Sequence, residues 1–269
     1  MARLIKKIIS LFVILSLLPL LLASPKVIDS KKKEIIINDI AIPVLNYHKV
    51  DEQKIALSIS PSDFEQQMKY LSEEGYHTIT PTEMMNALEY GTELPEKPIM
   101  ITFDDGYLDN YTNAYPVLLK YGFTATIFVV TGFINHDPRF MNWDQIREMK
   151  ANGFVFGSHT VNHKSLTELS YYEAKNELLL SAEELDKQLG IEEHFLAYPT
   201  GTYNLTIAKL AEACGYRAAF TIKYGDVDEA SNYYALERIP IFKGQKTFRS
   251  FFFRLNFTKT LQRLGLIRT

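Results

Sequence analysis

Two adjacent carboxylates, Asp104 and Asp105, follow directly on an apolar run, Ile99–Phe103, and precede Gly106. Burial of two charges at the end of a strand is costly unless a cation or hydrogen bonds compensate for the lost hydration. Because neighbouring strand residues point to opposite faces, both carboxylates can serve one site only where the strand ends, and Gly106 permits a turn there. On these residues alone, a solvated loop tip is an equally good interpretation.

Two histidines, His159 and His163, follow a second apolar run, Phe154–Ser158, in the same way. Four-residue spacing on one helical turn would place both imidazoles on the same face, as a shared metal ion requires. A pair at this spacing is by itself more often two surface histidines. The strand end that precedes the pair, together with the two carboxylates elsewhere, favours a metal site.

One aspartate and these two histidines would supply three ligands and leave a fourth position for water, which is the arrangement of a catalytic zinc ion. Such an ion lowers the pKa of its water and polarises a carbonyl group. The second carboxylate could then accept the proton of the water as a general base. We therefore expect one divalent ion, Zn²⁺ in preference to Co²⁺ or Ni²⁺, at a hydrolytic site.

The elements that must position these residues alternate between strand and helix patterns. Candidate strands are the apolar, β-rich runs at residues 44–47, 78–80, 99–103, 125–130, 154–158, 194–198, 218–221 and 238–241. Capping signals predict helices that begin after Thr80, Asn142 and Ser170. The pattern predicts an α/β fold, a distorted (β/α) barrel of seven to eight strands in a single domain, with the site at the carboxyl ends of the strands.

Bulk composition narrows the function class. The 269 residues are 46% hydrophobic and 23% charged, which suits one catalytic domain of this size. A net charge of −3 argues against a nucleic-acid partner. Cys214 is the single cysteine, so an internal disulfide and a multi-cysteine metal site are excluded. We expect a monomer.

The N-terminal segment is typical of exported proteins. Arg3, Lys6 and Lys7 precede an apolar run of 16 residues, Ile8–Ala23. This run is somewhat shorter than the roughly 20 residues that comfortably span a bilayer. We predict a signal peptide or membrane anchor at residues 1–23, with the anchor slightly favoured, and a linker at 24–40. The protein would then act outside the cytoplasm, anchored in the membrane or secreted to the cell surface.

Residues 102–106 read Thr-Phe-Asp-Asp-Gly and residues 158–163 read Ser-His-Thr-x-x-His. These motifs resemble the signatures of the polysaccharide deacetylase family, also called the NodB-homology family, and the resemblance covers roughly residues 41–255. It implies a distorted (β/α) barrel, a divalent metal ion (usually zinc), and removal of acetyl groups from sugars. By position, Asp104 matches the general base, and Asp105, His159 and His163 match the metal ligands. We assign residues 41–256 to this domain.

The third family motif departs from the expected pattern. Ala197 stands where the family usually has an arginine that braces the base, although Pro199 is retained. The backbone N–H of Thr200 could still donate to an oxyanion, because that role needs no side chain.

The late histidine that usually supplies the general acid is missing, since no histidine follows His194. The substitute is His48, which ends the apolar run at residues 43–47. This early histidine resembles the biofilm-polysaccharide branch of the family, in which the arginine also tends to be absent. A purely structural role for His48 is the alternative.

The resemblance makes an acetylated polysaccharide the expected partner, with poly-N-acetylglucosamine first and peptidoglycan, chitin or xylan as alternatives. Candidates for stacking on sugar rings are Tyr107, Trp143, Tyr198 and Tyr203, although a core position suits Trp143 equally well. Two rival functions are an inactive carbohydrate-binding relative that keeps the barrel as a scaffold, and a metal-dependent esterase or amidase for small molecules. The intact aspartate pair and histidine pair favour the polysaccharide enzyme.

The C-terminal segment, residues 242–269, carries seven basic residues and no acidic one, interspersed with phenylalanine and leucine. Up to about residue 256 we expect an amphipathic helix that packs on the barrel. Residues 257–269 are predicted to form a basic amphipathic tail, which could lie on an anionic membrane surface near the N-terminal segment or contact an acidic polymer.

Overall fold

A computed structural model describes residues 41–243 and 247–267 of the chain. The predicted signal peptide or anchor at 1–23 and the linker at 24–40 lie outside these residues. Within the two described ranges, no helix combines the length and the apolar character that crossing a bilayer requires.

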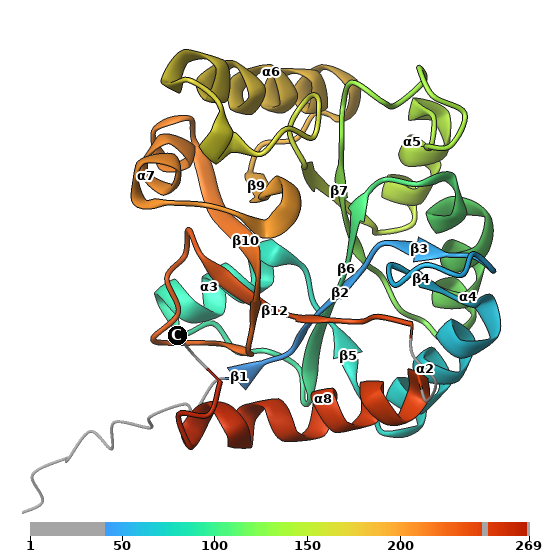
Figure 1. The fold of residues 1–269 in the computed structure, drawn as a ribbon. Helices are drawn as coiled ribbons and strands as arrows, with labels where there is room; N and C mark the ends of the chain where they lie inside the picture. The colour runs from blue at the N-terminus through green and yellow to red at the C-terminus, as the bar shows by residue number, and fades with distance from the viewer. Residues whose placement is uncertain (1–40, 244–246, 268–269) are drawn as a thin grey trace, which may run out of the picture. The chain divides into compact units, whose positions relative to one another are not determined.

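Parallel strands close into a seven-strand barrel (Figure 1). In order around the ring they are β2 (Val44–Tyr47), β12 (Leu236–Pro240), β10 (Tyr216–Tyr224), β9 (His194–Ala197), β8 (Val155–Ser158), β7 (Thr126–Val129) and β6 (Pro98–Asp105). Pairing of β2 with β6 closes the ring, and the short strand β5 (His77–Thr78) pairs with β6 outside it. The predicted distorted (β/α) barrel is confirmed, and each of the eight candidate strands corresponds to one of these strands.

Alternate residues of the barrel strands face the inside and the outside of the ring. Phe128 of β7 packs against Phe220 of β10, with 5.3 Å between ring centroids, and Met100 of β6 belongs to the same buried cluster. Because β7 and β10 are not neighbours in the ring, this cluster fills the barrel interior. Ile101 and Phe103 belong instead to the cluster between β6 and the surrounding helices. Strand periodicity therefore directs Asp104, like Met100, towards the interior.

Helices surround the barrel (Figure 1). In chain order they are α2 (Pro61–Glu73), α3 (Pro81–Tyr90), the π-helix η2 (Asn110–Ala114), α4 (Tyr115–Lys120), α5 (Trp143–Ala151), the 3₁₀ turn η3 (Leu166–Glu168), α6 (Tyr171–Leu189), the 3₁₀ turn η4 (Pro199–Gly201), α7 (Leu205–Ala213) and α8 (Thr247–Arg263). The capping boxes expected at Thr80, Asn142 and Ser170 are all formed, each with a reciprocal bond to the residue three positions later.

Two pairs of short strands form separate two-stranded sheets. β1 (Ala41–Ile42) pairs with β11 (Val227–Asp228), and β3 (Lys49–Val50) pairs with β4 (Ser58–Ile59). Helix α8 is joined to β11, because Gln262 accepts a hydrogen bond from the Asp226 backbone N–H at 2.8 Å and donates to the Asp228 carboxylate at 3.1 Å. The chain thus enters the barrel domain beside the last turn of α8.

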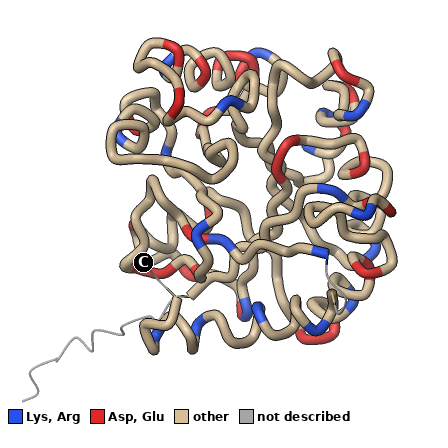
Figure 2. Tube along the Cα trace, in the orientation of Figure 1, with Lys and Arg blue, Asp and Glu red and all other residues tan. Residues whose placement is uncertain are grey.

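Helix α8 continues through residue 257, where the sequence suggested that the tail begins. Its inner face buries Phe251 and Leu255. Its outer side leaves Phe252, Phe253 and Phe257 exposed. Lys and Arg recur along the helix, which contains no acidic residue (Figure 2).

Candidate active site

Strand β6 ends in the two carboxylates, and the chain turns at this point. Asp104 is 2% exposed and Asp105 is 6% exposed. The backbone of Asp105 is left-handed (φ 76°), and so is that of Gly106 (φ 81°). A Cβ at Gly106 would lie 2.9 Å from Cγ1 of Val129, so this turn favours glycine sterically as well as conformationally. The turn lets Asp104 face the barrel interior while Asp105 reaches the adjacent histidines.

Asp105, His159 and His163 come together, with one potential ligand atom from each lying within 4.8 Å of the others. Oδ1 of Asp105 is 3.4 Å from Nε2 of His159 and 3.2 Å from Nε2 of His163. The prediction of a helical turn between the histidines is wrong. Residues 159–163 form an irregular loop in which Thr160 (φ 66°) and His163 (φ 55°) are left-handed. The loop, rather than helical periodicity, brings the two imidazoles to one side.

The donor atoms fit a divalent metal ion. Oδ1 of Asp105 is buried and has no hydrogen-bond partner among the described residues, which is costly for a carboxylate unless a cation binds it. Nδ1 of His159 lies 2.7 Å from the Ala197 carbonyl oxygen, a contact that places the ring proton on Nδ1 and leaves the Nε2 lone pair for a metal. Burial raises the pKa of Asp105, but the protonated forms of the His159 and His163 imidazoles hold it well below its ordinary value, a role that a bound cation would take over.

Asp104 is held by an arginine that the sequence analysis did not identify. Nη1 and Nη2 of Arg238 donate to Oδ1 and Oδ2 of Asp104, each at 2.7 Å. Arg238 lies in β12, has no exposed surface, and also donates through Nε to the Thr221 carbonyl at 2.8 Å. Burial alone would raise the pKa of Asp104, but the charge of Arg238 holds it below its ordinary value.

A usable signal for Arg238 was present in the sequence. An arginine inside a strand of a buried parallel barrel has no route to solvent and therefore requires a carboxylate partner. The family arginine is expected at position 197 in β9, whereas this chain carries its arginine on β12, two strands further around the ring. The departure noted at Ala197 therefore does not leave Asp104 without an arginine partner.

His48 follows β2 and lies at the same end of the barrel. Its Nε2 is 3.9 Å from Oδ2 of Asp104, and its side chain is 16% exposed. Its Nδ1 is buried without a hydrogen-bond partner among the described residues. Burial lowers the pKa of His48, while the carboxylates of Asp104 and Asp105 oppose that shift. The imidazole is thus next to the aspartate pair and partly open to solvent.

The predicted groove residues divide into two groups by exposure. Tyr107 is half-buried, stacks on Phe140 and lies near Asp105, which together with burial raises the pKa of its hydroxyl to about 12. Tyr198 has no exposed surface and Trp143 is only 5% exposed, which leaves little area for either ring to stack on a sugar.

The turn after β9 contains Thr200, whose backbone N–H is the predicted oxyanion donor. Pro199 is buried, whereas Thr200 is exposed and left-handed (φ 59°). Tyr203 is partly buried and stacks on Tyr198 with 5.5 Å between ring centroids. Thr200 is thus the exposed residue of this turn, and Tyr203, like Tyr107, keeps part of its surface open to solvent.

Comparison with known sequences places this site in context. The profile described as Polysaccharide deacetylase matches residues 91–219. YxkH of Bacillus subtilis (strain 168), whose name assigns it to the polysaccharide deacetylases, is 36% identical over 203 residues, which cover 76% of this chain and 72% of that protein. The poly-beta-1,6-N-acetyl-D-glucosamine N-deacetylase of Staphylococcus aureus (strain MSSA476) is 29% identical over 242 residues, covering 79% and 83% of the two chains.

Solved structures show the same fold. The Streptococcus pyogenes deacetylase PplD, determined in complex with acetate, superposes with a TM-score of 0.74 at 31% identity and covers 80% of this chain and 97% of its own. IcaB from Ammonifex degensii superposes with a TM-score of 0.68 at 28% identity and covers 79% and 95% of the two chains.

Proposed function

The chain belongs to the polysaccharide deacetylase family, and on that premise we propose that it removes N-acetyl groups from a cell-surface polysaccharide, with poly-N-acetylglucosamine as the preferred substrate. The substrate assignment is supported by the Staphylococcus aureus relative, which is named for this polymer and is similar over most of its length. It is also supported by His48, the early histidine that lies beside Asp104. Peptidoglycan, chitin and xylan are the alternative polymers.

One observation carries the proposal: a metal-type triad and a separate, arginine-held carboxylate meet at the end of β6. Asp105 contacts both histidines, whereas Asp104 is paired with Arg238. A scaffold that only bound sugars would have no need to keep two buried carboxylates ionised. The pairing therefore favours hydrolysis over an inactive carbohydrate-binding role.

Each residue can be given a step in amide hydrolysis. A divalent ion held by Asp105, His159 and His163 would polarise the acetyl carbonyl and acidify the attacking water. Asp104 accepts a proton from that water, because Arg238 keeps its carboxylate ionised. As the C–N bond breaks and the water oxygen bonds to the carbonyl carbon, His48 donates a proton to the amine nitrogen. The products are acetate and a free amino sugar.

The groove and the ion complete the proposal. The Thr200 backbone N–H donates to the oxyanion, and the half-buried ring of Tyr107 contacts the sugar. Two imidazoles and one carboxylate are typical ligands of catalytic Zn²⁺, so we assign Zn²⁺, with Co²⁺ or Ni²⁺ as functional substitutes.

We further propose that the protein is an exported monomer associated with the membrane. The basic and apolar N-terminal residues 1–23 support export. The described chain enters the domain beside the last turn of α8, and α8 exposes Phe253 and Phe257 between basic residues. Exposed aromatic rings flanked by arginine and lysine suit the surface of an anionic membrane.

The test is acetate release by the full-length, zinc-loaded chain from a panel of acetylated polymers: poly-N-acetylglucosamine, peptidoglycan, chitin oligomers and acetylxylan. We expect poly-N-acetylglucosamine to give the highest rate, and Asp104→Asn to remove it. Release from another polymer at a higher rate would change the substrate. Metal binding without acetate release from any of them would contradict the enzymatic assignment and support a binding role.

A further inference from the structure

The loop between the two histidine ligands adopts an unfavourable backbone conformation. Thr160 and His163 both have positive φ, and a β-branched residue such as threonine rarely adopts this conformation. Such residues persist only where their surroundings impose the conformation. Something outside the loop must therefore hold residues 160–163 in place.

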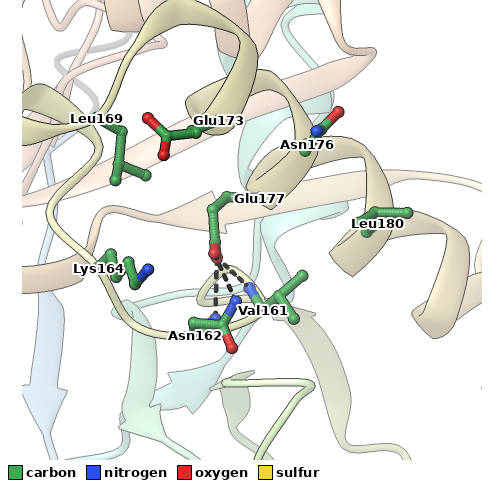
Figure 3. Close-up of a pocket in the computed structure, with 8 residues that line it drawn as sticks. All are labelled: Val161, Asn162, Lys164, Leu169, Glu173, Asn176, Glu177 and Leu180. Carbon is green, nitrogen blue, oxygen red and sulfur yellow. Dashed lines mark hydrogen bonds between the residues drawn. The ribbon is translucent and has the colours of Figure 1, made fainter.

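Glu177 of α6 supplies much of that restraint (Figure 3). Its Oε2 accepts hydrogen bonds from the backbone N–H groups of Val161 and Asn162, each at 2.9 Å. Its Oε1 accepts a third bond, at 2.6 Å, from the side-chain amide of Asn162. All three bonds fall between the two left-handed residues, and Glu177 itself is only 7% exposed.

Helix α6 is in turn bonded to β8, the strand that directly precedes His159. Ser181 lies one turn after Glu177 on the same helical face. Its hydroxyl oxygen is 2.7 Å from the hydroxyl oxygen of Ser158, at the end of β8. On the other side of the loop, the Gly132 N–H donates to the Val161 carbonyl at 2.9 Å. A Cβ at Gly132 would lie 2.5 Å from that oxygen, so the approach requires glycine.

We infer that Glu177 is a positioning residue for the metal centre, which sets the place of His163 by fixing the backbone of Val161 and Asn162. The inference rests on the proposed metal site and deepens it. The loop requires the hydrogen-bond acceptors of Glu177 rather than its charge, because the three groups that contact it are neutral N–H donors. Residues that orient metal ligands from outside the ligand set typically change metal affinity by about 10–100-fold when they are removed.

The experiment compares Co²⁺ affinity and the visible Co²⁺ spectrum of the full chain with those of three variants. Glu177→Ala removes the acceptors and should weaken Co²⁺ binding by about 10–100-fold and alter the ligand-field bands. Glu177→Gln should restore affinity to near the original value, because one amide oxygen can accept both backbone bonds while the Asn162 amide rotates to accept from the new amide group. Glu183→Ala, at an exposed position on the same helix, is the matched control and should bind Co²⁺ normally.

The outcomes separate the inference from the function on which it rests. Undiminished Co²⁺ affinity in Glu177→Ala, with only a lower Tm, would overturn the positioning role and leave the metal site intact. Failure of the unaltered chain to bind Co²⁺ would overturn the metal site, and the positioning role with it. If Glu177→Ala does not fold, Glu177→Asp, whose carboxylate is one methylene too short, must bind Co²⁺ more weakly than Glu177→Gln for the inference to stand.

Discussion

Two buried carboxylates outside the metal triad, Asp104 and Asp226, differ in what compensates their charge. Asp104 makes a bidentate pair with Arg238, and its pKa lies below its ordinary value. Asp226, just after β10, is 3% exposed and has a carboxylate oxygen without a hydrogen-bond partner among the described residues. Burial raises its pKa to about 7, although the charge of Lys259 opposes the shift and Asp228 reinforces it.

The difference gives the two carboxylates opposite effects on stability as the pH changes. Ionised Asp104 stabilises the fold above its ordinary pKa, and this contribution is lost as the pH falls through the lowered pKa. The contribution of Asp226 to stability depends on pH in the opposite direction. It is complete below the ordinary pKa of an aspartate and is lost as the pH rises through about 7. At neutral pH Asp104 is therefore ionised, whereas Asp226, with a pKa of about 7, is close to half protonated.

Replacement of the base should have the largest effect. Asp104→Asn keeps the shape of the side chain but cannot accept a proton, so kcat should fall by about 10²–10⁴-fold while metal content is unchanged. Acetate release and metal analysis of the same preparation measure both quantities. Near-normal kcat with metal bound would place the base elsewhere.

Removal of Arg238, the cation that pairs with Asp104, should have the second-largest effect, which is a loss of stability. Arg238→Met leaves Asp104 buried without its partner and should lower the free energy of unfolding by about 3–5 kcal/mol. Denaturant unfolding of the single variant and of the Asp104→Asn/Arg238→Met double variant gives the test, and the double variant should recover part of the loss. Equal destabilisation in both would show that Arg238 acts through Thr221 and packing rather than through Asp104.

Replacement of Asp226, whose pKa is raised by burial, should stabilise the protein above neutral pH. Asp226→Asn should raise the free energy of unfolding at pH 8 by up to about 4 kcal/mol, which is the value of a shift of roughly three pKa units. At pH 4 the difference should nearly vanish, because Asp226 is then protonated in the folded chain. Urea unfolding at the two pH values measures the effect, and a difference independent of pH would contradict the assignment.

The smallest effect is expected for the proposed acid, which lies beside Asp104 without a direct hydrogen bond. His48→Phe should lower kcat on an N-acetyl substrate by about 10²-fold and remove the alkaline limb of the pH–rate profile. An ester substrate should lose less, because its alcohol leaves with less help from an acid. Persistence of the alkaline limb, or equal losses on both substrates, would make His48 structural.

The sequence predicted the features whose signals are local. The strand that ends at Ser158 and the caps at Thr80 and Ser170 depend on residues within a few positions of each other, and the structure has them where expected. The strand predicted to end at Phe103 continues through both carboxylates to Asp105. Arg238 was missed because its partner is 134 positions away in the chain.

The loop between the histidines was misjudged for a different reason. A threonine or a histidine gives no sign in the sequence that its backbone will be left-handed, and the four-residue spacing imitates a helical turn. Glu177 likewise cannot be distinguished in the sequence from other acidic residues on a helix, because its contact with Val161 depends on the tertiary fold.

The bonds that hold residues 160–163 include those from Glu177, Gly132 and Thr131, and they do not use the metal-binding atoms of the histidines. These bonds would hold the loop in place whether or not an ion is bound. Binding then requires little loss of chain entropy, and exchange of one divalent ion for another needs no refolding step. The ion of the proposed metal site should therefore exchange under native conditions, at a rate set by its dissociation from the three ligand side chains.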